Sequence, residues 1–136
     1  MKKIVIGVIL AGTLLVAGPY TKEDRIKDMQ QMAHAMNDIQ TGFFYNNYDM
    51  VSIAVNNLSD AVKRVKPPVE EEEEKDFMKR HMNNMVKMTN KIIRKIDQKS
   101  FTLLARFKDK DYAQAMQAYT KIAKKCMECH AEMRRW

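Results

Sequence analysis

Residues 51–65, VSIAVNNLSDAVKRV, carry a clear helical pattern. Apolar side chains recur there at steps of three and four, which places them on one face of an α-helix. This stripe consists of Val51, Ala54, Val55, Leu58, Val62 and Val65. The pattern predicts a helix that starts near Asn47 or Asp49 and ends at Pro67-Pro68, because proline cannot continue a helix.

Three other segments show the same spacing. The first opens at Thr21, which forms a capping box with Asp24, and is expected to run to about Gly42 or Tyr45. The second opens with the acidic run 70–74, where negative side chains favour a helix N-terminus, and either stops near Lys99 or continues through Leu103 and Leu104. The third opens at Asp109 or Asp111. The three expected stripes are, in turn, Met29, Met32, Met36, Ile39 and Phe43; Met78, Met82, Met85, Met88 or Thr89, Ile92 and Ile96; and Tyr112, Met116, Tyr119, Ala123, Cys126, His130 and Met133.

The composition also favours helices. The 136 residues include 4 Gly, 3 Pro and 12 Met, so helix breakers are few and straight-chain residues are common. Four amphipathic helices with short connections predict an all-α, antiparallel up-down-up-down four-helix bundle. No internal repeat or second domain is visible, and we expect one domain over residues 18–136.

Residues 1–17 have the form of a secretory signal peptide. Lys2 and Lys3 precede an apolar stretch from Ile4 to Val16, and small residues follow at Ala17 and Gly18. We expect cleavage after Ala17, with a retained N-terminal anchor as the alternative. The mature chain is then expected in the periplasm, with no membrane span of its own.

The motif with the clearest chemistry is Cys126-Met127-Glu128-Cys129-His130, a C-x-x-C-H run that contains the only two cysteines of the chain. On a helix, two thiols three residues apart can form thioethers with both vinyl groups of a haem, and the imidazole can reach its iron. The alternatives are a redox dithiol, half of a zinc site or a disulfide. A zinc site needs two further ligands, and a redox dithiol is expected beside a βαβ pattern that this sequence lacks. The motif therefore predicts one covalently attached haem c.

The iron ligand opposite His130 is expected from the first helix, whose start lies beside the end of the last helix in such a bundle. Met29 is favoured by its early position, whereas Met32 and Met36 are expected to pack in the core or to be the alternative ligands. His34 is off the stripe and is expected to be exposed. For His81 we expect an exposed or hydrogen-bonded side chain rather than a ligand.

These features resemble the cytochrome c-prime family, in particular its low-spin, Met-ligated members, and the soluble periplasmic b-type cytochromes with the same bundle. The resemblance rests on R-x-x-x-M from Arg25 to Met29, on the Pro67-Pro68 break, on Lys75-Asp76-Phe77, and on His130 near the end of the chain. It implies that Met29 and His130 are the axial ligands of the haem iron and that Cys126 and Cys129 form the thioethers.

The expected function is electron transport by a periplasmic monohaem c-type cytochrome, and not an enzymatic reaction. The alternative is a five-coordinate cytochrome c-prime that binds nitric oxide or carbon monoxide. A haem peroxidase is disfavoured because no distal base and arginine pair can be identified.

The formal charge of +7, about +5 without Lys2 and Lys3, favours acidic redox partners. Five basic residues flank the motif and are expected either to form a docking rim or to be an ordinary solvated face: Lys121, Lys124, Lys125, Arg134 and Arg135. Nucleic acid is not an expected partner of an exported chain without a basic stripe. The resemblance allows a homodimer.

Overall fold

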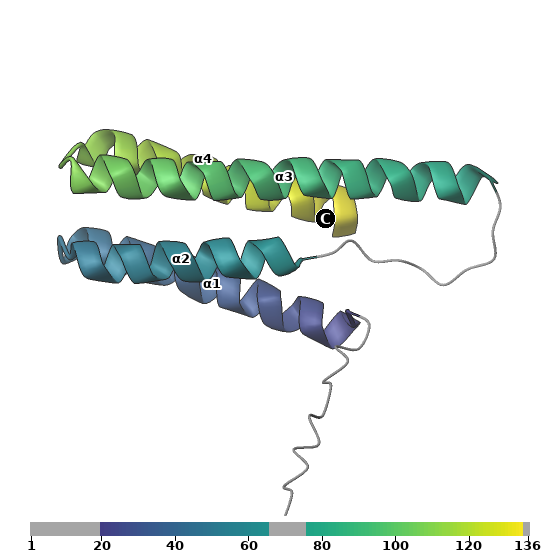
Figure 1. Ribbon diagram of the computed structural model, residues 1–136, viewed down its shortest axis with the longest axis horizontal. Coiled ribbons are helices and arrows are strands. Elements are labelled where there is room, and N and C mark those ends of the chain that lie inside the picture. Colours follow the sequence, from purple (N-terminus) through teal and green to yellow (C-terminus); the bar gives the residue numbers. More distant parts are fainter. Residues whose placement is uncertain (1–19, 66–75, 135–136) are drawn as a thin grey trace, which may run out of the picture.

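The computed structural model describes residues 20–65 and 76–134, which form four α-helices (Figure 1). The helices are α1 (Lys22–Phe44), α2 (Tyr48–Arg64), α3 (Asp76–Lys108) and α4 (Tyr112–Arg134). These described ranges contain no strand. The predicted all-α, four-helix fold is therefore confirmed. The predicted signal peptide, the acidic run 70–74 and the prolines at 67 and 68 lie outside the described residues.

Side-chain caps fix the helix starts that the sequence predicted. At α1, Thr21 Oγ1 accepts a hydrogen bond from the backbone N–H of Asp24 at 3.1 Å, and Asp24 Oδ2 accepts one from the backbone N–H of Thr21 at 2.9 Å. Asn47 caps α2 through the backbone N–H of Met50. Of the two candidates at α4, Asp111 accepts from the backbone N–H of Gln114. Each cap satisfies an N–H group that has no partner inside its helix.

The third helix continues past Lys99 to Lys108, which decides between the two ends that the sequence allowed. Leu103 is fully buried and Phe107 is 5% exposed, so this last part of α3 contributes to the core. Apolar burial thus holds the helix together beyond the point where its methionine-rich stripe ends.

The core confirms the expected face of α2 and corrects that of α4. Every residue of the predicted α2 stripe is buried. On α4, however, Tyr112 and Met116 are 45% and 41% exposed, and the buried positions are Ala115, Ala118 and Ile122. The prediction that Tyr112 and Met116 face the core was therefore wrong, because small alanines form this part of the helix interface.

The helices pack in series, α1 on α2, α2 on α3 and α3 on α4, while no Cα atom of α1 lies within 8 Å of one in α4 among the described residues. Near the α1–α2 and α3–α4 connections, α1 still reaches the other pair through aromatic rings, with the centroids of Phe43 and Phe107 4.9 Å apart. Figure 1 shows α1 separating from α3 and α4 toward the end where α4 terminates. The bundle is therefore open between the first half of α1 and the last half of α4. No described helix is long and apolar enough to cross a membrane.

Candidate functional site

A cavity of about 170 Å³ occupies this open end of the bundle. All four helices contribute to its walls, which are mostly aliphatic carbon and sulfur. Its lining consists of Met29, Met32, Ala33 and Met36 from α1, Val62 from α2 and its C-cap residue Val65, Thr89, Ile92, Ile93 and Ile96 from α3, and Cys126, Cys129 and His130 from α4. Such walls are suited to an apolar ligand.

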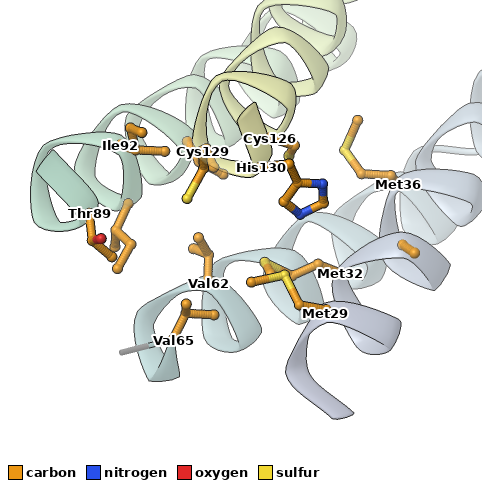
Figure 2. Close-up of a pocket in the computed structure, with 13 residues that line it drawn as sticks. Met29, Met32, Met36, Val62, Val65, Thr89, Ile92, Cys126, Cys129 and His130 are labelled. Carbon is orange, nitrogen blue, oxygen red and sulfur yellow. The ribbon is translucent and has the colours of Figure 1, made fainter. Parts of the chain in front are cut away.

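The three side chains of the C-x-x-C-H motif meet in this cavity. Cys126 and Cys129 are partly buried, pack against the core and are not joined in a disulfide. Their spacing of three residues places both on the side of α4 that faces the opening, and His130 lies one turn beyond Cys126. Figure 2 shows the imidazole of His130 directed from α4 toward the side of the cavity formed by α1. One helix therefore presents both thiols and the imidazole to the same space.

All three candidate methionine ligands lie on the α1 wall of the cavity (Figure 2). Met32 is 9% exposed and belongs to the core, whereas Met29 and Met36 are partly buried and pack against its edge. This difference fits the expectation that Met32 is chiefly a packing residue. The structure thus brings Met29, Cys126, Cys129 and His130 together from opposite ends of the sequence.

The two other histidines are not part of the cavity. His34 and His81 are both exposed, and neither lines the space that His130 enters. The expectation that His34 is exposed is confirmed, and His81 takes the exposed alternative.

The environment of the two thiols is poorly suited to a reactive dithiol. Burial raises the pKa of Cys126 from an ordinary value of 9.0 to about 11, and it also raises the pKa of Cys129. Redox-active and metal-binding cysteines generally have lowered pKa values, because the thiolate is the reactive form. The raised pKa values therefore argue against a redox-active dithiol or a zinc site at these two cysteines.

Two polar features of the site were not identified from the sequence. The hydroxyl of Thr89 is buried in the cavity wall without a hydrogen-bond partner among the described residues. The sequence pattern predicted only that either Met88 or Thr89 faces the core. The carboxylate of Asp28, next to Met29, is also buried and bonds Arg64 of α2 and Tyr20. The local sequence gives no sign that Asp28 is buried, since its ion-pair partner Arg64 lies 36 residues away in the chain.

Basic side chains from two helices surround the motif. Lys125 pairs with Glu128, and this hydrogen bond is the largest influence that lowers the pKa of Glu128. Lys124 and, from α3, Lys95 lower it further. Lys95 was not among the expected rim residues because only the packing of α3 on α4 brings it there. Arg135 lies outside the described residues, and so does the side chain of Arg134.

No family model, curated protein or solved structure matches the chain. Among the described residues, no group of three or more His, Cys, Asp and Glu side chains is placed to hold a metal ion.

Proposed function

We propose that this chain is a periplasmic c-type cytochrome that carries electrons through one covalently attached haem. The observation that carries the proposal is the convergence of Cys126, Cys129 and His130 of α4 with the methionine-lined wall of α1 across one apolar cavity. A covalently attached haem fits these residues, because Cys126 and Cys129 could hold its vinyl groups and His130 and a methionine of α1 could bind its iron. The lack of close backbone contact between α1 and α4 leaves room for such a group.

The two cysteines would bind the haem by addition. Each thiol would add across a vinyl group, with the sulfur bonding one vinyl carbon and the thiol hydrogen going to the other. Such an addition would consume no oxidant or reductant and would leave both cysteines as thioethers.

The remaining residues of the site would hold the iron and exclude water. When bound, haem iron supplies reversible one-electron transfer between its ferric and ferrous states. His130 would bind it from α4 and Met29 from α1, and a thioether ligand raises the reduction potential relative to harder ligands. Aliphatic walls such as Val62, Ile92 and Ile96 keep the polarity of the site low, which disfavours the more highly charged oxidised state.

The proposed partner is an acidic redox protein that meets the α3–α4 side of the bundle. Helix α3 carries nine Lys and Arg against two Asp, whereas α1 carries three against four acidic residues. Lys95, Lys124 and Lys125 extend this positive charge to the cysteines. Such a charge distribution favours encounter with a negatively charged surface near the haem attachment.

One observation favours the alternative, a five-coordinate cytochrome c-prime that binds nitric oxide or carbon monoxide. The α1 wall opposite His130 is apolar throughout, so a methionine that does not bind iron would leave a pocket suited to small, weakly polar gases. In that case the purified protein is high-spin and binds carbon monoxide without any substitution.

The test of haem attachment is extraction. The haem of the purified protein should stay with the polypeptide in acidified organic solvent, since two thioethers hold it. The double variant Cys126→Ala, Cys129→Ala should contain at most extractable haem, and Met127→Ala is the matched control because Met127 lies between the cysteines and is 55% exposed. Free extraction of the wild-type haem would refute the proposal.

A further inference from the structure

The buried carboxylate of Asp28 joins three parts of the fold beside the cavity. Asp28 is 5% exposed. Its Oδ1 atom accepts a hydrogen bond from Arg64 Nε of α2 at 2.8 Å, and its Oδ2 atom accepts one from the hydroxyl of Tyr20, which precedes α1, at 2.9 Å. Arg64 also donates to the side-chain oxygen of Gln31, one turn further along α1. The first part of α1 is thereby linked to the last turn of α2.

This link acts where α1 has no support from α4. The proposed thioethers and the proposed ligand His130 all belong to α4, whereas the methionines belong to α1, and the two helices make no close backbone approach. The position of α1 at the open end therefore depends on α2, on which it packs. Any shift of α1 relative to α2 would change the distance between the methionine sulfur and the iron.

The link also fixes the rotation of α1 about its own axis. Successive residues of an α-helix point about 100° apart. When Asp28 is held against Arg64 of α2, the neighbouring Met29 is held toward the cavity, whose wall it forms. An apolar pair of similar size would bury this position without the same directional restraint, because hydrophobic contact is not directional.

We propose that the Asp28–Arg64 ion pair positions the axial methionine: it anchors the open end of α1 to α2 and thereby sets how closely the Met29 thioether approaches the iron. The role of both residues is positioning, since neither lines the cavity. This inference rests on the proposed function, and it adds a second determinant of the coordination state besides the ligand itself.

The test uses the purified protein with its covalent haem and the variants Asp28→Asn and Arg64→Met. Each removes the ion pair and keeps most of the side-chain volume. We expect a weaker far-red sulfur-to-iron absorption band in the oxidised protein and carbon monoxide binding in the reduced protein at least tenfold faster than in the wild type. A tenfold loss of the preference of the thioether for ferrous iron would lower the reduction potential by about 59 mV. The effect of the double variant should be smaller than the sum of the two single effects, because both substitutions remove the same ion pair.

Asp97→Asn is the matched control. Asp97 also links two helices, since it accepts a hydrogen bond from Ser59 of α2 at 2.5 Å and pairs with Lys63 at 3.2 Å. It lies on α3, which has no Cα atom within 8 Å of α1 among the described residues. We expect Asp97→Asn to lower the thermal midpoint and to leave the far-red band and the potential unchanged. Equal spectral changes in Asp97→Asn and Asp28→Asn would overturn the positioning role, because the effect would then be general loosening of the bundle.

The remaining outcomes separate this inference from the function on which it rests. A wild-type protein with the far-red band that Asp28→Asn and Arg64→Met both leave intact would refute positioning and keep methionine ligation. A wild-type protein without the band would overturn both the ligation by Met29 and the positioning role.

Discussion

The rings of Phe43 in α1 and Tyr119 in α4 meet edge to face, with centroids 6.0 Å apart and planes inclined by 61°. Phe43 also stacks on Phe107 of α3. These aromatic contacts join α1 to the α3–α4 pair, whereas the Cα atoms of α1 and α4 stay more than 8 Å apart in the described chain. The cavity with Cys126 and His130 begins about two turns beyond this contact. The bundle is therefore held together at one end and open at the other, where the cavity lies.

Met29→Ala should remove the proposed methionine ligand of the iron. We expect loss of the far-red band of the oxidised protein, a lower reduction potential and an iron open to carbon monoxide, because a soft thioether stabilises ferrous iron. The measurements are absorption spectra of both redox states and a potentiometric titration.

Met32→Ala and Met36→Ala are the controls for that substitution. Both side chains line the same cavity, and Met32 is a core residue. We expect them to keep the band and to lose about 2 to 5 kcal/mol of unfolding free energy where the side chain is buried. If the band disappears only in Met32→Ala or only in Met36→Ala, that methionine is the ligand and the assignment to Met29 is wrong.

Gly42→Ala should destabilise the fold without changing the spectrum. A Cβ atom on Gly42 would lie 2.7 Å from Val51 Cγ2 and 3.2 Å from the Val51 backbone nitrogen, which is too close for packed atoms. We expect a loss of about 1 to 3 kcal/mol in urea unfolding, since overpacking outweighs the better helix propensity of alanine. Gln40→Ala, at an exposed position of the same helix, should change stability by no more than about 0.5 kcal/mol. Equal stability of Gly42→Ala and wild type would contradict the close approach of α1 and α2.

The reactivity of Cys126 in haem-free protein should follow its raised pKa. With a pKa of about 11 instead of 9.0, the thiolate fraction at pH 8 is roughly a hundredfold smaller than that of an unperturbed thiol. Alkylation by iodoacetamide should therefore accelerate about tenfold per pH unit up to pH 10, without a plateau. The same protein in urea should level off near pH 9. A plateau near pH 9 in the folded sample would show that the thiol is not buried.

The basic residues around the motif, Lys95, Lys124 and Lys125, should control the rate of encounter with anionic redox partners. We expect Lys95→Gln with Lys124→Gln to slow oxidation of the reduced protein by ferricyanide, roughly threefold to tenfold at low ionic strength, and to weaken its salt dependence. Lys108→Gln with Lys110→Gln changes the net charge equally at the connection of α3 and α4. The rate is measured by stopped-flow absorption. If the two double variants slow the reaction equally, the effect comes from net charge and not from the position of Lys95 and Lys124.

Most of the secondary structure followed from local rules. The α2 stripe was predicted in full because its apolar residues are large, regularly spaced and bounded by a cap at Asn47, so spacing alone identifies the buried face. The start of α1 at Thr21 likewise depends only on neighbours within one turn. The buried face of α4 could not be predicted in this way. Tyr112 and Met116 are large and apolar but exposed, whereas the buried residues Ala115 and Ala118 are too small to mark a core-facing stripe.

Local patterns were enough to predict four helices and to place two thiols and an imidazole on one side of the last helix, because side chains three and four residues apart lie on the same side of a helix. What these three side chains face depends on how the helices pack. The separation of α1 from α4, the burial of Asp28 against Arg64 and the approach of Lys95 to the motif all join residues far apart in the chain. Such contacts depend on how whole helices pack, and packing is set by the shapes of both partners at once rather than by the pattern of either one.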